Sequence, residues 1–139
     1  MGLIDQVKLI DFTERGDERG YLVVIESEKD IDFQLKRLFY IYGSEQNIVR
    51  GQHANMKTEF VLVNVIGSSK VTVKDGLGNE KTYTLDRPNL GLYIPRLLWK
   101  DMFDFSNDSV LLVLASEFYD SNEYIRDYDE YQKIMKKSL

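Results

Sequence analysis

Hydrophobic residues recur along most of the chain at every second position or in short solid runs, and turn residues interrupt them roughly every eight to twelve positions. A period of two is typical of a strand with one buried face, and a solid run is typical of a strand buried on both faces. The pattern predicts strands at Val7–Phe12, Tyr21–Ser27, Lys36–Tyr42, Glu59–Ile66, Lys70–Lys74, Lys81–Leu85, Leu92–Ile94, Lys100–Phe105 and Val110–Ala115. So many short strands indicate an all-β sandwich or barrel.

The clearest turn in this pattern lies between Lys70–Lys74 and Lys81–Leu85. The intervening segment contains Gly76 and Gly78, and glycine readily adopts the positive φ that a tight reversal needs. We therefore expect these two strands to form an antiparallel hairpin.

The period changes near the C-terminus. Hydrophobic residues there recur every three to four positions, as on one face of a helix, at Tyr124, Ile125, Tyr128, Tyr131, Ile134 and Met135. Asp120 and Glu123 have the spacing of a capping box, which predicts a helix over about 121–137. We expect its tyrosines to pack over the outside of the sheet with their hydroxyl groups in water, and a role in binding is the alternative.

The composition fits a single domain over residues 1–139. The formal net charge of -5 argues against a nucleic-acid partner, because such proteins generally present a clustered basic face. An anionic ligand would therefore need a local basic pocket. No hydrophobic run is long enough to span a membrane and the first residues lack a signal-peptide core, so we expect no membrane partner and a cytoplasmic location.

The counts of cysteine and histidine restrict the chemistry. The chain has no cysteine and a single histidine, His53, which rules out thiolate catalysis and a structural zinc site. A catalytic metal would need a nearly all-oxygen ligand set. What remains is proton transfer by one imidazole, or a protein without catalytic activity.

His53 lies in a motif that resembles the first cupin motif, Gly51-x-His53-x-Asn55-x-x-x-Glu59. In that motif two histidines and a glutamate converge inside a small barrel. Here Asn55 replaces the second histidine, and Lys100 stands near the position of a further one. We therefore expect a cupin-type jelly-roll barrel that holds no metal but keeps its pocket. Alternation along the strand would turn His53 and Asn55 to the same, inner face.

Several side chains that exchange protons or bind anions lie on segments that would line the same barrel, namely Arg37, Tyr40, Arg50, Glu59, Tyr93 and Lys100. Together they would surround one base with proton donors and cations. For each arginine taken alone, the alternative is ordinary surface charge. Trp99 is a further candidate for contacting a substrate, and packing in the core is its alternative.

Several blocks in one order resemble the sugar nucleotide 3,4-ketoisomerases. They are Lys36–Tyr42, Arg50–Ala54, Gly91–Ile94, Trp99–Met102, Asp104–Ser106, Val113–Ser116, Tyr119-Asp120 and Glu123–Arg126. The resemblance implies a cupin enzyme without metal or cofactor that acts on dTDP-4-keto-6-deoxy-D-glucose, on the way to 3-amino-3,6-dideoxyhexoses of bacterial surface polysaccharides. It also implies a homodimer, often with exchanged N-terminal strands, and the alternation from Leu3 to Phe12 would suit such a strand.

The resemblance also suggests roles for individual residues. The family's catalytic histidine matches His53, and its tyrosine in Lys-Arg-x-x-Tyr matches Tyr40. A ketone at C4 acidifies the hydrogen on C3, so a neutral His53 can remove it to give an enediolate and return a proton to C4. Tyr40 or Lys100 can pass a proton between the two sugar oxygens, and Lys100 or Arg50 can stabilise the developing charge. Asn55 can only orient, and a galacto or a gluco product at C4 stays open.

The diphosphate of such a substrate needs positive partners, for which Arg19, Arg37 and Arg50 are the candidates. Two other functions remain open. A 3,5-epimerase of the same substrate would also deprotonate beside the ketone, but it usually pairs its histidine with an aspartate, and the sequence offers no evident pair. A non-catalytic cupin that binds a sugar or serves in assembly would explain Asn55 and Lys100 as remnants of a lost metal site.

Overall fold

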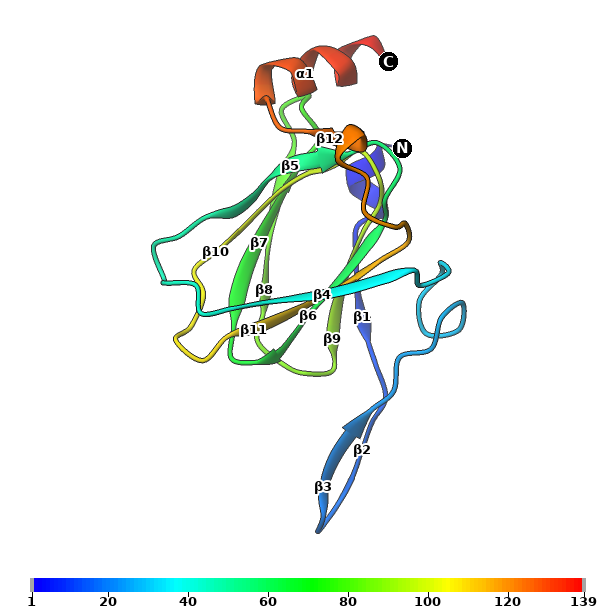
Figure 1. The fold of residues 1–139 in the computed structure, drawn as a ribbon, viewed down its shortest axis with the longest axis vertical. Coiled ribbons are helices and arrows are strands. Elements are labelled where there is room, and N and C mark those ends of the chain that lie inside the picture. Colours follow the sequence, from blue (N-terminus) through cyan, green and yellow to red (C-terminus); the bar gives the residue numbers. More distant parts are fainter. Residues whose placement is uncertain (1, 139) are drawn as a thin grey trace.

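The computed structural model describes residues 2–138 as a barrel of two five-stranded antiparallel sheets, with a two-stranded hairpin projecting from one end and a helix at the other (Figure 1). The first sheet has the strand order β1-β9-β6-β11-β4, and the second has the order β12-β5-β10-β7-β8. The strands are β1 (Lys8–Asp11), β2 (Glu14–Asp17), β3 (Gly20–Val23), β4 (Arg37–Tyr42), β5 (Arg50–Asn55), β6 (Phe60–Ile66), β7 (Ser69–Lys74), β8 (Glu80–Leu85), β9 (Leu90–Ile94), β10 (Trp99–Phe103), β11 (Val110–Ala115) and β12 (Tyr124–Ile125), and the helix is α1 (Tyr128–Lys137). None of the helices within residues 2–138 has the length and hydrophobicity needed to cross a membrane.

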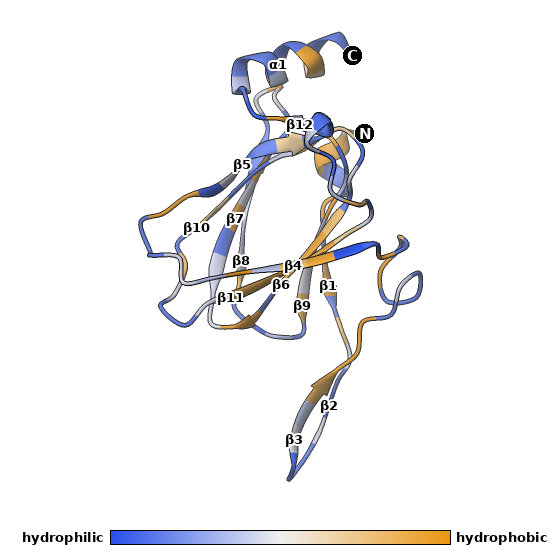
Figure 2. Cartoon of the chain, viewed as in Figure 1, coloured by the Kyte–Doolittle hydropathy of each residue, from blue (hydrophilic) through white to orange (hydrophobic). Residues whose placement is uncertain are grey.

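The inner faces of the two sheets form the main core. Phe60 and Leu62 of β6 pack there with Val71 and Val73 of β7, while the alternate residues of β6 face outward. The outer face of the first sheet is covered by a second cluster that includes Phe12, Ile31 and Phe33 from the chain around the hairpin. Figure 2 shows hydrophobic residues along β4 and β11 in the barrel and also on the projecting hairpin.

The predicted hairpin around Gly76 and Gly78 is confirmed as β7 and β8, which pair along their whole length. Both glycines have positive φ, and the carboxylate of Asp75 accepts hydrogen bonds from the backbone amides of Leu77 and Asn79 across the turn. Local sequence therefore sets this turn.

The predicted strand Tyr21–Ser27 is wrong in its extent, because β3 ends at Val23 and residues 24–27 carry no strand. Its partner β2 was not predicted. All four residues of β2 are exposed, so this strand has no alternation of hydrophobic and polar residues to reveal it. The strand β5, which carries His53, was also absent from the predicted set, because its apolar positions are few.

The C-terminal helix is present but begins later than predicted, at Tyr128, with Asp127 as its N-cap. Asp120 caps a separate 3₁₀ turn, Ser121–Glu123, and Tyr124–Ile125 then form β12. The predicted water contact of the tyrosines is wrong for Tyr131, which is fully buried. Its hydroxyl lies 2.6 Å from the carbonyl oxygen of Leu97, to which it donates.

Candidate active site

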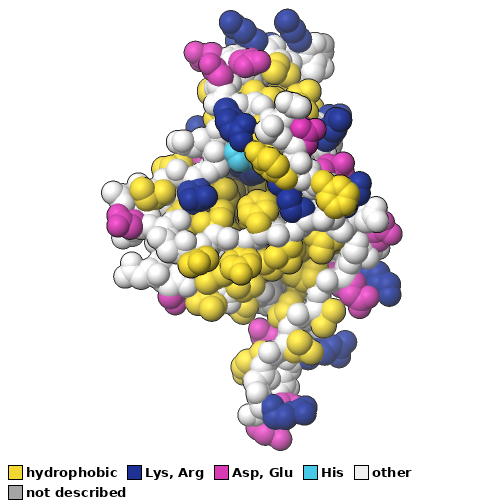
Figure 3. Space-filling model, in the orientation of Figure 1, with side chains coloured by type: hydrophobic (Ala, Val, Ile, Leu, Met, Phe, Trp, Pro, Cys, Tyr) yellow, Lys and Arg dark blue, Asp and Glu magenta, His cyan; other side chains and the backbone are white. Residues whose placement is uncertain are grey.

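A cavity of about 460 Å³ opens between the sheets and contains His53. Figure 3 shows this histidine in a hollow of the surface, with hydrophobic and basic side chains around it. Two groups of residues form the cavity, one from the two sheets and one from the segment that precedes α1. They are Phe39, Tyr40, Ile41, Tyr42, Arg50, Gly51, His53, Phe60, Leu62, Lys100, Met102, Val113, Tyr119, Tyr124 and Arg126.

The backbone of β5 is distorted just before His53. Gly51 and Gln52 have φ values of 84° and 55°, and the register of β10 against β5 shifts between Lys100 and Asp101. A Cβ on Gly51 would come within 2.8 Å of the carbonyl oxygen of Lys100, so this close approach requires glycine. The irregularity resembles the bulges by which strands redirect side chains next to active sites.

His53 is held as a neutral base. Its Nδ1 lies 2.9 Å from the carbonyl oxygen of Gly51, which can only accept, so Nδ1 carries the proton and Nε2 is left as the acceptor. Burial lowers the pKa of His53 to about 4, and the nearby charge of Lys100 adds to this effect. At neutral pH the imidazole is therefore uncharged and able to take a proton.

Lys100 pairs with His53 across β5 and β10, so the two side chains share the inner face. It is only 3% exposed, and its Nζ lies 4.2 Å from the ring centroid of Phe60. Burial lowers the pKa of Lys100 to about 7; the charge of Glu123 opposes this shift and that of Arg37 adds to it. The lysine is thus a cation that is close to losing its proton.

Asn55 is buried beside this lysine, and its Oδ1 accepts a hydrogen bond from Nζ of Lys100 at 3.3 Å. His53 and Asn55 therefore both face inward, as alternation along the strand predicted. The carboxylate of Glu123 accepts hydrogen bonds from the backbone amides of Lys57 and Thr58, just beyond β5. Burial alone would raise the pKa of Glu123, but the hydrogen bonds from Thr58 and the two amides outweigh burial and lower it.

Aromatic and basic side chains surround the imidazole at the mouth of the cavity. The ring of Tyr124 lies 4.8 Å from that of His53, and the guanidinium of Arg126 lies 4.5 Å from the centroid of Tyr124. Arg37 reaches the hydroxyl of Tyr124 from β4, and its guanidinium lies 5.4 Å from the ring centroid of Phe39 and 5.6 Å from that of Tyr119. The site therefore joins one neutral base to several cations.

Two predicted residues do not reach the cavity because they lie on the outer face of the first sheet. Tyr93 pairs with Val61, whose side chain belongs to the outer cluster, and its hydroxyl donates to Glu59 at 2.5 Å. Tyr93 also lies beneath the ammonium group of Lys8. The expectation that Glu59 and Tyr93 line the barrel is therefore wrong. Adjacent residues of a strand face opposite sides of the sheet, and these two side chains lie on the outer side.

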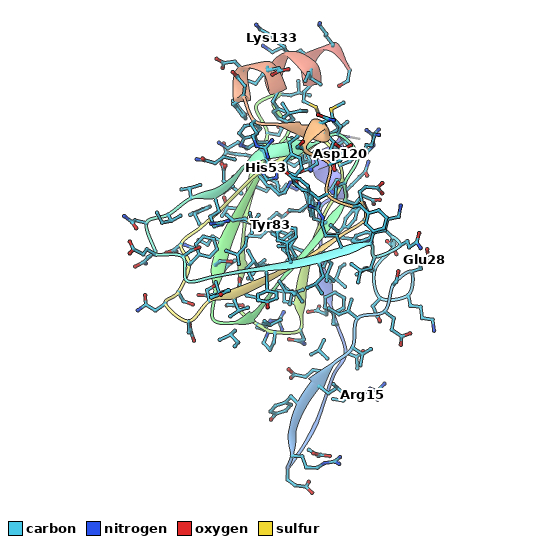
Figure 4. All side chains as sticks on the ribbon, in the orientation of Figure 1. Arg15, Glu28, His53, Tyr83, Asp120 and Lys133 are labelled. Atoms are coloured by element: carbon cyan, nitrogen blue, oxygen red, sulfur yellow. The ribbon has the colours of Figure 1, made fainter. Side chains whose placement is uncertain are left out.

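Two further predicted residues lie apart from His53, and a third only borders the cavity. Trp99 packs against Tyr128 and Tyr131 outside the second sheet, so the packing alternative describes its position. Arg19 lies on the projecting hairpin, where it pairs with Asp17, and Figure 4 shows that this hairpin is remote from His53. Tyr40 borders the cavity, but it pairs with Leu112 of the outer cluster and its side chain is 59% exposed.

Sequence reasoning missed Tyr119, Tyr124 and Arg126 as cavity residues and Glu123 as a buried charge. Glu123, Tyr124 and Arg126 fall within the helix predicted over about 121–137, which would have given them an ordinary packing role. The structure instead pairs Tyr124 with Asn55 across β12 and β5, and this pairing of residues distant in sequence carries the whole segment to the cavity. The blocks Tyr119-Asp120 and Glu123–Arg126, already noted for their family resemblance, were the available signal.

Within residues 2–138, no three histidine, aspartate or glutamate side chains come together as metal ligands. His53 has Lys100 and Asn55 as inner neighbours, and an ammonium group is not a metal ligand. The absence of a metal and of any cofactor from the working protein stays a prediction.

Comparison with known proteins identifies relatives over nearly the whole chain. Residues 5–136 match the profile of the family described as FdtA, WxcM-like, C-terminal. The chain is also 45% identical to the TDP-4-oxo-6-deoxy-α-D-glucose-3,4-oxoisomerase of Aneurinibacillus thermoaerophilus, over 94% of this chain and 93% of that protein.

Solved structures give the same result. The 3,4-ketoisomerase of Helicobacter canadensis has 43% identity and a TM-score of 0.91, over 94% of this chain and 97% of its own. The sugar 3,4-ketoisomerase QdtA of Thermoanaerobacterium thermosaccharolyticum, solved with TDP, has 44% identity and a TM-score of 0.92, over 96% of both chains. A dTDP-4-dehydrorhamnose 3,5-epimerase of Bacillus anthracis shares the fold alone, at 14% identity and a TM-score of 0.76, over 89% of this chain and 79% of its own. The predicted all-β, cupin-type fold with one C-terminal helix is confirmed.

Proposed function

Because the chain belongs to the sugar nucleotide 3,4-ketoisomerase family, we propose that it interconverts the 4-keto and 3-keto forms of a dTDP-linked 6-deoxyhexose. One observation carries the proposal beyond family membership. His53, a neutral base, and Lys100, a buried cation, are register partners that face the same cavity. An enolisation needs this combination of a proton acceptor and a positive charge for the oxygen beside it.

The reaction begins at the hydrogen on C3, which the C4 ketone acidifies. Nε2 of His53 removes this hydrogen as a proton, and the electron pair moves toward the C4 oxygen to form an enediolate. Lys100 stabilises the negative charge, and Asn55 holds the lysine in place through its Oδ1. The imidazolium then returns its proton to C4, so the base is regenerated.

The nucleotide end of the substrate needs cations outside the reacting centre. Arg50 and Arg126 both line the cavity and both have exposed side chains that can reach the two phosphates. Arg126 joins Arg50 in the role that the sequence had suggested for Arg19, Arg37 and Arg50. The product's use in surface polysaccharide and a cytoplasmic location stay predictions.

The proposal is tested by NMR with chelator-treated protein and dTDP-4-keto-6-deoxyglucose in deuterated water. We expect a 3-keto sugar to appear with deuterium at C4, and deuterium to enter C3 of the remaining substrate; the spectrum of the product gives its configuration at C4. Exchange at C5 instead would identify an epimerase. Binding of the nucleotide sugar with neither a new keto sugar nor exchange at either carbon would identify a non-catalytic binding protein.

We further propose that the protein works as a homodimer joined through the projecting hairpin. In the described part of the chain, β2 and β3 pair only with each other, and Tyr21 on this hairpin is 80% exposed. Leu38, Tyr40 and Tyr42 form an exposed row on the outer face of the edge strand β4. When exposed segments of this kind pack on a second copy of the chain, much of their apolar surface is removed from water.

The expected exchange of the N-terminal strand needs one adjustment. The segment β1, which the sequence had suggested for the partner's sheet, pairs with β9 of its own chain. The hairpin is left as the exchanged element, and Arg19 near its tip would then act at the partner's cavity rather than at its own.

Sedimentation velocity tests the dimer. We expect the protein to sediment as a dimer and a Tyr21→Lys, Leu22→Lys double variant to sediment as a monomer. Leu77→Lys in the β7–β8 turn is the control, because it places a lysine at an exposed apolar residue outside the hairpin. A monomeric unmodified protein, or a double variant that stays dimeric, would contradict the proposal.

A further inference from the structure

The proposed reaction needs a group that moves a proton between the two sugar oxygens. Tyr40, the phenol expected for this task, points to the outer face of β4. The inward position beside it is held by Phe39, which has no hydroxyl. If a phenol does this work, it must come from another element.

Of the tyrosines that line the cavity, Tyr124 is the one whose ring contacts that of His53 in the described residues. β12 pairs with β5 so that Tyr124 lies opposite Asn55 and shares its inner side, while the next residue, Ile125, packs outward with Ala54. The ring of Tyr124 lies 4.8 Å from the ring of His53 at an interplanar angle of 50°. This side chain lines the same cavity as His53 and Lys100.

A cation stands beside the hydroxyl of Tyr124. Nη1 of Arg37 lies 3.5 Å from this oxygen, the distance of a long hydrogen bond in which the guanidinium donates. The other two nitrogens of Arg37, Nε and Nη2, are buried and have no hydrogen-bond partner within residues 2–138. A phenolate oxygen accepts hydrogen bonds more strongly than a phenol oxygen does, so the unused donors of this guanidinium can hold the negative charge that forms on the oxygen of Tyr124 during the reaction.

We propose that Tyr124, supported by Arg37, is the group that transfers the proton from the C3 hydroxyl to the C4 oxygen. This inference rests on the proposed ketoisomerase function. After His53 has taken the C3 hydrogen, Tyr124 gives its proton to the C4 oxygen and becomes a phenolate beside Arg37. The phenolate then takes the proton of the C3 hydroxyl as the C3 carbonyl forms, and His53 returns its proton to C4. Both side chains end in their starting states, so no further reactant is needed.

The arrangement separates this task from that of Lys100. The ammonium group of Lys100 is fixed by Asn55 and by the ring of Phe60, which suits a stationary charge. Tyr124 instead lies with Arg126 at the mouth of the cavity, where the substrate must enter. The lysine therefore stabilises charge and the tyrosine moves the proton.

The test is Tyr124→Phe, which removes one oxygen atom and keeps the ring. Without the relay, the enolate can only be protonated again at C3. We expect product to form about 100-fold more slowly, the size of a lost acid–base group. Deuterium should still enter C3 of the substrate within about threefold of the normal rate, because His53 is unchanged. The affinity for dTDP should stay within about twofold, because the hydroxyl is proposed to act on the sugar oxygens and not on the nucleotide.

The control is Tyr128→Phe, the same chemical change four positions along, where the ring packs against Trp99 outside the cavity. Product formation by this control should be unchanged. Arg37→Lys, which keeps a charge, should be faster than Arg37→Met. A Tyr124→Phe variant that forms product at the normal rate, or that loses C3 exchange and product equally, would overturn the relay. Absence of both C3 exchange and a 3-keto product with the unmodified protein would overturn the proposed function and the relay with it.

Discussion

The barrel carries two polar clusters that differ by the face of the strand on which they lie. Inside, Lys100 is buried, His53 is half-buried, and both line a cavity. Outside, Tyr93 and Glu59 form a hydrogen bond on the outer face of the first sheet, beside Lys8. Both clusters contain groups that suit acid–base chemistry, and both were expected to contribute to the site.

Burial acts on the two clusters in the same way but with different consequences. Inside, it lowers the pKa of His53 to about 4 and of Lys100 to about 7, so a base and a cation coexist near neutral pH. Outside, burial and the hydrogen bond to Glu59 raise the pKa of Tyr93, so that phenol keeps its proton. The comparison teaches that a shifted pKa indicates function only where a cavity gives a substrate access to the group.

The strongest test of this contrast replaces one acid–base side chain by an amide in each cluster. We expect His53→Asn to lower kcat about 10³-fold, because the only base is lost, with little change in thermal stability. Glu59→Gln should keep kcat within about twofold, since its carboxylate faces away from the cavity. Steady-state kinetics and thermal melts check both. Full activity of His53→Asn would remove His53 as the base, and a large loss in Glu59→Gln would bring the outer cluster into the mechanism.

Lys100→Met should separate activity from stability. We expect kcat to fall about 10²-fold, as when one group that stabilises an oxyanion is removed. The free energy of unfolding at pH 7 should rise by about 1–4 kcal/mol, because a flexible apolar side chain replaces a buried amine. Urea unfolding measures the second effect, and a less stable variant would contradict it.

The stability difference should also depend on pH. The unfolded chain keeps Lys100 protonated up to about pH 10, whereas the folded chain releases this proton near pH 7. The unfolded state therefore binds more protons between these values, so this lysine makes the unmodified protein more stable as pH rises through that window. The difference in the free energy of unfolding between Lys100→Met and the unmodified protein should therefore shrink from pH 7 to pH 10. A constant difference would mean that folding does not lower the pKa of Lys100.

The pH dependence of kcat/KM tests the inner cluster without mutation. His53 must be neutral, so activity should fall as pH drops below about 4. Lys100 must be charged, so activity should fall as pH rises above about 7, approaching tenfold per pH unit. Glu123, Arg37 and His53 are the charged or titratable groups that face this lysine. An alkaline limb that is unchanged in Lys100→Met would assign the limb to another group.

The smallest effect is expected in the outer cluster. Tyr93→Phe removes the hydrogen bond to Glu59 at a half-buried position, which should cost about 1 kcal/mol of stability. The value of kcat should not change. Urea unfolding measures the stability and steady-state kinetics measure kcat. A clear fall in kcat would contradict the division between the inner and outer faces.

The strand pattern was predictable where one face of a strand is apolar and not where it is polar. The hairpin β7–β8 follows from alternation and from Gly76 and Gly78, whereas β2 has four exposed residues and no period. In the site, His53 was predictable as the single imidazole, and Lys100 from its place in the motif. Tyr124 was not, because its spacing fits a helix as well as a strand.

The sequence by itself determined the fold family, the single imidazole and the presence of Asn55 where the cupin motif has a second histidine. Those facts depend on residue identity and on order along the chain. Only the tertiary structure decided that Glu59 and Tyr93 face outward, that Tyr124 and Arg126 line the cavity, and that Arg37 reaches the hydroxyl of Tyr124. The physical reason is that adjacent strand residues point to opposite faces, so a single position of register, set by partners far away in the chain, decides which groups meet.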